Sequence, residues 1–286
     1  MTTTARRARG PTIIINVDDL GLHPAVRRAV EACAARGTVT SASLLANGPD
    51  QDSIRPYQGI SLGVHLNIVR GTPLSPRSEV PSLVGADGNF LGSFGRVASR
   101  LLRRQLRHDE VSLEWSRQVD ALQQRGIELT HLDAEQHTHC LPGLFPIACA
   151  VAREHGIGWV RRSEERFGNL SLGMPALRRG LLRALSVHGQ CPPGIQSADA
   201  VWGLAEQGSA FTAKACARAL HGIGPRLIEV VCHPGEPHAG DPALPASFGR
   251  MRVQRWWEHE LHALLDGSWI STAQEQGWRL SGFQSL

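Results

Sequence analysis

Short apolar runs alternate along the chain with segments of helical periodicity. The run "TIIINV" (residues 12–17) is rich in β-branched residues and indicates a buried parallel strand. After the turn "DDLGLH", Pro24 stands where a first helical turn accepts proline, residues 25–36 carry helical spacing, and Gly37 is placed to end the helix. Because residues 38–46 read as the next strand, this segment predicts a strand–helix–strand unit.

The same alternation recurs through the chain. Further strands are expected over residues 60–66, 127–133, 157–161 and 226–233, and helices over residues 110–126, 145–156 and 212–222. Repeated units of this kind with short glycine stops predict an α/β fold with a largely parallel sheet, open or closed into a TIM-like barrel. Residues 67–95 and 233–249, rich in Gly, Pro and Ser, are expected to form long loops over the carboxyl ends of the strands. The pattern over residues 163–210 does not place any strand.

The composition indicates one globular domain with a short basic tail. The chain has 286 residues, 42% of them hydrophobic, and a formal charge of +4. No repeat or linker divides it, so we expect a single domain over residues 11–286 after a disordered tail over residues 1–10, which holds Arg6, Arg7 and Arg9. With one Tyr and no basic motif interleaved with aromatic residues, the chain lacks the pattern of a dedicated nucleic-acid-binding protein.

The cysteine pattern and the absence of long apolar runs bear on location. Six cysteines occur without a C-x-x-C pair, which indicates small buried residues or free thiols in a reducing compartment. No run approaches the roughly 20 apolar residues of a membrane span, and "MTTTARRARG" lacks the apolar run of a secretory signal. We therefore expect a cytoplasmic protein without a transmembrane segment.

The stretch "THLDAEQHTHC" (residues 130–140) sets an acid or an imidazole at every second position. These residues are His131, Asp133, Glu135, His137 and His139. In an extended backbone, residues two apart share a face, so the five side chains are expected to converge on one side of a strand. Burying them costs a few kcal/mol each unless they are paired or bound to a cation. The stretch therefore predicts a metal site, and the alternative is a solvated strand end.

Acids and imidazoles also follow other predicted strands. Asp18 and Asp19 come directly after the first strand, and His65 and His233 end two later ones. In parallel barrels, catalytic groups lie at the carboxyl ends of strands, so these residues are expected to meet at one rim. Adjacent residues point differently, so one aspartate can ligate a metal while its neighbour acts as a base. The alternatives are an aspartate that caps the following turn and, for His65, an ordinary core histidine.

Four blocks of the sequence resemble the YdjC-like carbohydrate deacetylases, a family that includes the chitooligosaccharide deacetylases and the hopanoid-associated HpnK proteins. The blocks are "INVDDLGLHPAVRRAVEACAARGTVTSASLLANG", "LGVHLNIVRGTPL", "THLDAEQHTHCLPGLFPIA" and "EVVCHPG". They occur in the family's order between residues 13 and 235. The resemblance implies a distorted (β/α) barrel like that of the NodB-like deacetylases, and a metal-dependent removal of N-acetyl groups from amino sugars.

Carried over by position, the resemblance makes Asp19 a metal ligand, Asp18 the general base and His65 a second ligand. The family's third ligand is typically a His within a D-S-H-x-H-x-H segment, and Glu135 stands at that position here. A carboxylate makes the site harder and more anionic, which favours Mg or Mn over Zn. Two alternatives stay open: His137 supplies the third ligand, or the metal site is degraded and the activity lost.

The expected cofactor is one divalent ion, Mg, Mn or Zn. Held by three protein ligands, it would lower the pKa of a bound water and polarise the acetyl carbonyl, while Asp18 takes the water's proton. The leaving amine also needs a proton. His233 is the candidate donor, because imidazole can hold a proton near neutral pH; the alternative is a satisfied loop histidine. Asp133 and His139 read as groups that orient the ligands.

The expected function is therefore a carbohydrate N-deacetylase. Its substrate would be an N-acetylated amino sugar, as an oligosaccharide, a sugar phosphate, or a glycolipid or other glycoconjugate. The alternatives are an O-acetyl esterase on the same scaffold and a sugar-binding barrel whose metal site is degenerate at Glu135. The family resemblance also allows a homodimer.

Overall fold

The computed structural model describes residues 10–163, 165, 180, 190–220, 226–249 and 251–286. In this part of the chain the strands are β1 (Thr12–Leu20), β2 (Ser41–Leu44), β3 (Ser61–Leu66), β4 (Leu129–Ala134), β5 (Trp159–Val160), β6 (Ala200–Trp202), β7 (Leu227–Cys232) and β8 (Arg279–Leu280). The α-helices are α2 (Pro24–Ala35), α3 (Phe94–Leu102), α4 (His108–Gln123), α5 (Phe145–Glu154), α7 (Ala213–Leu220), α8 (Trp257–Asp266) and α9 (Ser268–Glu275). Short 3-10 segments are η1 (Gln51–Ser53), η2 (Glu135–Cys140), η3 (Gly208–Ala210), η4 (Arg252–Trp256) and η5 (Phe283–Ser285).

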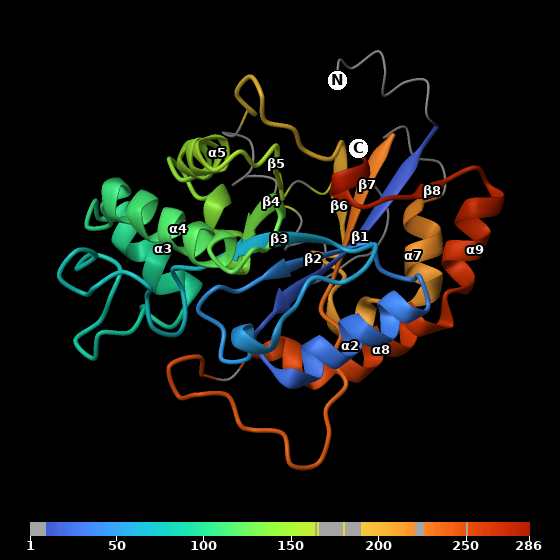
Figure 1. Ribbon diagram of the computed structural model, residues 1–286, viewed down its shortest axis with the longest axis horizontal. Helices are drawn as coiled ribbons and strands as arrows, with labels where there is room; N and C mark the ends of the chain where they lie inside the picture. The colour runs from blue at the N-terminus through green and yellow to red at the C-terminus, as the bar shows by residue number, and fades with distance from the viewer. Residues whose placement is uncertain (1–9, 164, 166–179, 181–189, 221–225, 250) are drawn as a thin grey trace.

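All strands belong to one parallel sheet around which the helices pack (Figure 1). Its order is β5-β4-β3-β2-β1-β7-β6, and β8 also pairs with β1. Gln196, just before β6, forms a parallel bridge with Trp159 of β5, so the two ends of the sheet approach each other. The predicted α/β fold, with parallel strands curled into a distorted barrel, is confirmed.

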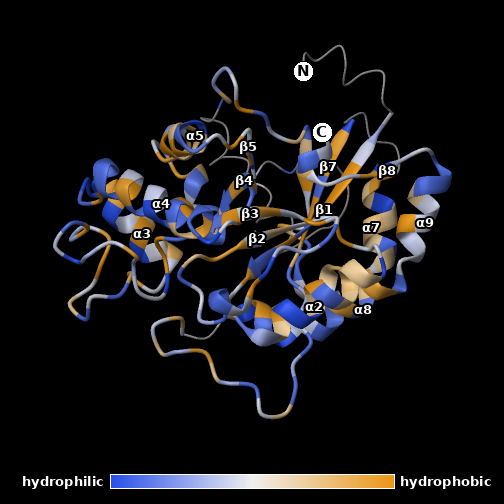
Figure 2. Cartoon of the chain, in the orientation of Figure 1, coloured by the Kyte–Doolittle hydropathy of each residue, from blue (hydrophilic) through white to orange (hydrophobic). Residues whose placement is uncertain are grey.

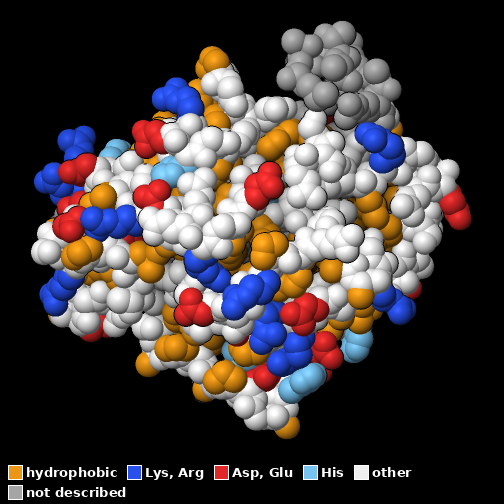
Figure 3. Space-filling model, viewed as in Figure 1, with side chains coloured by type: hydrophobic (Ala, Val, Ile, Leu, Met, Phe, Trp, Pro, Cys, Tyr) orange, Lys and Arg blue, Asp and Glu red, His pale blue; other side chains and the backbone are white. Residues whose placement is uncertain are grey.

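The main apolar core lies between the outer face of the sheet and the helices. On β1, Ile13, Ile15 and Val17 alternate toward this core, as the two-residue period of a strand requires. Figure 2 shows the hydrophobic residues concentrated along the strands and on helix surfaces turned toward the sheet. On the surface seen in Figure 3, acidic and basic side chains are interspersed. None of the helices in the described ranges is long and apolar enough to cross a membrane.

The inner face of the sheet is apolar at its base. Ile14, Trp159, Leu227 and Phe283 form a separate apolar cluster there. One strand step above Ile14, Asn16 meets the buried ring of His131, whose Nε2 lies 3.1 Å from the Asn16 Oδ1 atom. Along β1 and β4 the barrel interior therefore turns from apolar to polar, and this polar part leads to the site described below.

The secondary structure differs from the prediction at two functional segments. The predicted extended conformation through residues 131–139 is wrong, because β4 ends at Ala134 and a 3-10 segment follows, with Gln136 and His137 at φ values of 50° and 57°. The first strand does not end before the two aspartates but continues through Leu20. The sequence pattern indicated neither the end of β4 at Ala134 nor the continuation of β1 through Leu20.

Other expectations have mixed outcomes. Residues 1–9 of the predicted tail lie outside the described residues, so the tail and the domain assignment stay predictions. The six cysteines are unpaired, and all but Cys191 are buried. Residues 67–93 and 233–249 are loops, but α3 begins at Phe94, inside a predicted loop, and β6 lies in the segment whose strands could not be placed. The helices α8 and α9 and the short strand β8 were not predicted.

Candidate metal centre and active-site cavity

A cavity of about 240 Å³ opens at the carboxyl ends of the strands. Its lining includes six residues singled out in the sequence: Asp18, Asp19, His65, Glu135, His137 and His233. It also includes Arg70, Gln136, Gln207 and Arg252, none of which the sequence pattern indicated. The strands β1, β3 and β7 and the segment after β4 thus bring their ends to one rim, as a parallel barrel requires.

Asp19, His65 and Glu135 form a compact group in this cavity. One potential ligand atom from each lies within 4.8 Å of the other two, and all three residues are buried. His65 Nε2 is 3.5 Å from Asp19 Oδ1 and 3.6 Å from Glu135 Oε2. Asp19 Oδ1 is buried without a hydrogen-bond partner. A desolvated carboxylate oxygen facing an imidazole and a second carboxylate fits a divalent cation, which would supply the missing partner.

An irregularity in β1 allows neighbouring aspartates to share this cavity. The pairing of β1 with β2 shifts register between Val17 and Leu20, and Asp19 adopts a φ of 66°. In a regular strand Asp18 and Asp19 would face opposite sides of the sheet. The left-handed conformation is tolerated by aspartate better than by most residues, and it turns both carboxylates toward the rim. Burial and the nearby Glu135 carboxylate raise the pKa of Asp19 to about 7.

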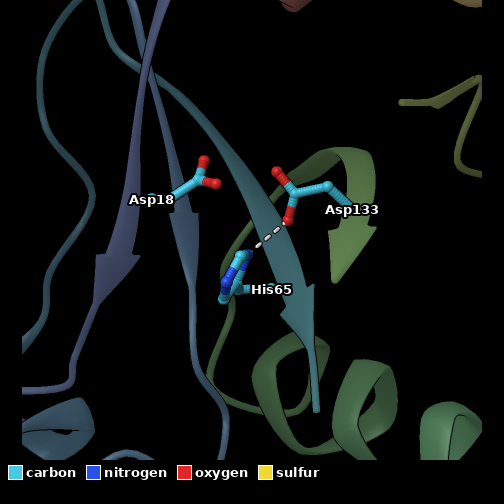
Figure 4. A group of neighbouring side chains, drawn as sticks. All are labelled: Asp18, His65 and Asp133. Carbon is cyan, nitrogen blue, oxygen red and sulfur yellow. Dashed lines mark hydrogen bonds and ion pairs between the residues drawn. The ribbon is translucent and has the colours of Figure 1, made fainter. Parts of the chain in front are cut away.

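His65 is oriented by Asp133 (Figure 4). Its Nδ1 atom lies 2.6 Å from Asp133 Oδ1, which leaves Nε2 facing Asp19 and Glu135. Burial lowers the pKa of His65, but the charge and hydrogen bond of Asp133 raise it well above its usual value. Asp18, His65 and Asp133 also lie close enough to form a metal-ligating group. Because Asp133 already accepts a hydrogen bond from His65, the free side of the imidazole is the one that faces Asp19 and Glu135.

A buried arginine, Arg161, binds three carboxylates beneath the cavity. Its Nη1 and Nη2 atoms donate to the two oxygens of Asp18, each at 2.8 Å, and Nη2 lies 2.5 Å from Asp133 Oδ2 and 2.7 Å from Glu229 Oε1. Burial raises the pKa of Asp18, but the charge and hydrogen bonds of Arg161 together with the His65 charge hold that pKa below the usual value. One guanidinium cannot neutralise three carboxylates, and burial raises the pKa of Glu229 to about 7 despite Arg161.

His233 lies in the cavity wall between two carboxylates. Its Nε2 is 3.9 Å from Asp18 Oδ2, and its Nδ1 is 3.9 Å from Glu260 Oε2. Glu260, from α8, also accepts the backbone N–H of His233 at 2.6 Å. The Nδ1 atom is buried without a hydrogen-bond partner. Thus Glu260 fixes the backbone at the end of β7 and the ring faces Asp18.

The three histidines of the "THLDAEQHTHC" stretch lie in three different surroundings. His137 lines the cavity, but in the described part of the chain it does not belong to either group of potential ligands. Its Nδ1 lies 3.2 Å from Ser163 Oγ, and burial, followed by the Arg161 charge, lowers its pKa to about 3. His139 Nε2 binds the backbone oxygen of Arg161 at 2.8 Å, and His131 lies in the barrel interior. The expected convergence of all five side chains is therefore wrong.

The sequence did not indicate two arginines and one glutamate that contact the site. Arg70, Arg161 and Glu260 each contact a residue that had been singled out. Arg161 is the last residue of the predicted strand "IGWVR", and this position was its only signal. Among 30 lysines and arginines, a single basic residue carries no spacing pattern that marks it.

The whole chain was compared with known protein families and proteins. The model of the family described as YdjC-like protein matches residues 12–275. The chain belongs to the YdjC-like family. It is 30% identical to a carbohydrate deacetylase of Mus musculus, over 96% of this chain and 94% of the relative, and 27% identical to a chitooligosaccharide deacetylase of Escherichia fergusonii, over 95% and 97%.

The fold of this chain also resembles that of a solved structure. A putative cellobiose-phosphate cleavage protein from Enterococcus faecalis superposes with a TM-score of 0.71, at 20% identity, over 96% of this chain and 98% of that one. At this identity the likeness concerns the fold.

Proposed function

We propose that the protein is a metal-dependent carbohydrate deacetylase that hydrolyses the N-acetyl group of an amino sugar. The observation that carries the proposal is the buried group of Asp19, His65 and Glu135 beside the Asp18–His233 pair in one cavity. The relatives named carbohydrate deacetylase and chitooligosaccharide deacetylase support the reaction and the carbohydrate substrate.

Asp19, His65 and Glu135 would hold the cation. When bound, a divalent cation polarises an acyl carbonyl and lowers the pKa of a water molecule. Two carboxylates and one imidazole make a hard set of donors, which favours Mg or Mn over Zn. Asp133 would keep the His65 lone pair on Nε2 by accepting a hydrogen bond from Nδ1.

Asp18 would accept the proton of the attacking water at Oδ2. Its Oδ1 atom already accepts hydrogen bonds from Asn16 Nδ2 and Arg161 Nη2, each at 2.8 Å. Oδ2 accepts one hydrogen bond, from Arg161 Nη1, so it retains a lone pair. The Arg161 charge keeps the carboxylate ionised, which is the state that a proton acceptor requires.

His233 would protonate the leaving amine. Its Nε2 atom lies 3.9 Å from Asp18 Oδ2, and the ring lines the same cavity. An imidazole can hold a proton near neutral pH and release it to an amine as the C–N bond breaks. The positions of the two groups therefore separate proton acceptance, at Asp18, from proton donation, at His233.

The test is acetate release by the purified protein loaded in turn with Mg, Mn and Zn. The substrates are N-acetylated amino sugars presented as oligosaccharides, sugar phosphates and glycolipids, each paired with an O-acetylated sugar. We expect release from an N-acetylated substrate, and a loss of about 10²- to 10⁴-fold in Asp18→Asn, the usual range for a general base. Asp109→Asn, at an exposed carboxylate, is the matched control. Equal rates for Asp18→Asn and wild type, or release from O-acetyl sugars alone, would overturn the proposal.

A further inference from the structure

Arg70 contacts the proposed ligand Glu135 on the oxygen that His65 does not face. Its Nε atom donates to Glu135 Oε1 at 3.3 Å, and Gln136 Nε2 donates to the same oxygen at 3.2 Å. The other oxygen, Oε2, lies 3.6 Å from His65 Nε2. Because a carboxylate oxygen has two lone pairs, both used at Oε1, only Oε2 is left for a cation.

Arg70 is held in this position by its surroundings. Asn67 Oδ1 accepts its backbone N–H at 3.2 Å, and Asn67 Nδ2 donates to its backbone oxygen at 2.9 Å. The guanidinium Nη1 donates to the backbone oxygen of Phe248, in the loop of residues 233–249, at 2.9 Å. The side chain is only 16% exposed. The contact with Glu135 is therefore part of a fixed arrangement at the cavity wall.

The charge of Arg70 matters because the proposed ligands include two carboxylates. Asp19 and Glu135 together cancel the charge of a dication, and a neutral centre stabilises the developing negative charge of an acyl oxygen less than a positive one. An arginine stays protonated under all ordinary conditions. Beside Glu135, it returns one positive charge to the centre without ligating the metal.

We propose that Arg70 is a positioning residue of the metal centre, which restricts Glu135 to one ligating oxygen and replaces the positive charge that a second carboxylate ligand removes. The inference rests on the proposed function, because it requires a cation held by Asp19, His65 and Glu135. It predicts that residues 70 and 135 depend on each other. An arginine suits a carboxylate ligand, and a neutral residue at position 70 suits an imidazole ligand.

The test is a calorimetric titration of the metal-free protein with Mn²⁺, together with turnover of the loaded enzyme. In Arg70→Gln, Glu135 gains a second ligating oxygen and a nearby positive charge is lost, so we expect Mn²⁺ to bind about tenfold more tightly while kcat falls about tenfold. A purely structural role for Arg70 would weaken Mn²⁺ binding instead. Arg252→Gln, at an exposed arginine of the same cavity, is the control, and its Mn²⁺ affinity should stay within about threefold of wild type.

Exchanging the ligand completes the test. Glu135→His alone should weaken Mn²⁺ binding about tenfold, because Arg70 then lies beside a neutral ligand. Arg70→Gln in the same chain should recover most of that affinity. Arg70→Lys keeps the charge and provides a check if the glutamine variant folds poorly, and it should retain more turnover than Arg70→Gln.

The outcomes separate this inference from the proposed function. If wild type binds Mn²⁺ but Arg70→Gln binds it equally or more weakly, the role of Arg70 is refuted and the deacetylase proposal stands. If Glu135→His is not rescued by Arg70→Gln, the charge dependence is likewise refuted. If wild type binds neither Mn²⁺, Mg²⁺ nor Zn²⁺, both proposals fall.

Discussion

His65 Nδ1 lies 2.6 Å from Asp133 Oδ1, and this buried hydrogen bond joins the adjacent strands β3 and β4. The pairing determines which nitrogen of His65 faces the cavity. A carboxylate on the remote nitrogen of a ligating histidine commonly fixes the ring and raises its basicity. Because Asp133 also binds Arg161, the same carboxylate links the proposed metal centre to the proposed base Asp18.

We predict that Asp133→Asn weakens Mn²⁺ binding by about 10- to 100-fold, since the amide no longer holds His65 with a charged acceptor. Calorimetric titration measures the change. Ser43→Ala is the matched control, because it removes the hydrogen bond from Ser43 Oγ to Asp133 Oδ2 and leaves the charge. Its affinity should change by less than about threefold. Wild-type affinity in Asp133→Asn would contradict a role for this contact in metal binding.

A second prediction concerns the stability that Arg161 provides. Removing one partner of a buried ionic network leaves unpaired charge, which costs about 3 to 5 kcal/mol. Arg161→Met should lower the free energy of unfolding in urea by this amount, since three buried carboxylates lose their shared counter-ion. Arg107→Met, in an ion pair with Asp109 whose side chains are both 66% exposed, should cost far less than Arg161→Met. Equal losses in the two variants would show that the network contributes no more than a surface pair.

The buried carboxyl of Glu229 predicts a pH dependence. Its pKa rises from 4.5 to about 7 on folding, mainly through burial. The stability that this group contributes is present below the unfolded pKa and is lost as the pH rises through the folded pKa. Glu229→Gln cannot ionise, so its free energy of unfolding should match wild type near pH 4 and exceed it by about 2 to 3 kcal/mol at pH 8. Urea titrations across this range measure the difference, and a gain that does not vary with pH would contradict the assignment.

Gly71 connects the two long loops near the cavity. It has a φ of 77°, its N–H donates to Ser247 O at 2.9 Å, and an added Cβ would lie 2.6 Å from the Phe248 ring. Gly71→Ala should therefore displace the loop of residues 233–249 and raise KM about tenfold or more, since Arg70 also binds Phe248. Limited proteolysis of that loop and steady-state kinetics measure the effect.

The control for Gly71 is Gly59→Ala. Gly59 has the same φ of 77°, but nothing lies within 4 Å of its added Cβ. Both alanine variants carry the cost of a left-handed backbone, roughly 1 kcal/mol, and only Gly71→Ala meets a neighbouring ring. If the two variants have the same KM, the contact between the loops does not influence substrate binding.

The strands that carry the site could be predicted because each is a short apolar run that ends in an acid or imidazole. Asp18, Asp19, His65 and His233 were placed at one rim by this logic, and the structure brings them to one cavity. The roles assigned to them stay predictions. The alternation after Asp133 was misleading, since Gln136 and His137 adopt left-handed φ values and the strand does not continue there. Such a change in the backbone has no apolar period to reveal it.

The arginine contacts could not be predicted for a different reason. Arg70 and Arg161 lie close in space to residues that are distant in sequence, such as Glu135 and Asp18. Hydrophobic periodicity reports which face of an element is buried, and it does not report which charged side chain fills a gap between elements. Only the assembled barrel shows that both arginines face carboxylates.

The polar part of the barrel interior around Asn16 and His131 and the apolar layer between the sheet and the helices should respond differently to engineering. Buried His131 illustrates this, because an added Cβ at Gly63 would lie 2.4 Å from its ring. A larger side chain at Gly63 would therefore displace His131, which lies beneath the proposed catalytic groups. Attempts to obtain a more heat-resistant variant should instead be directed to the layer between the strands and the surrounding helices, where packing can improve without touching the chemistry.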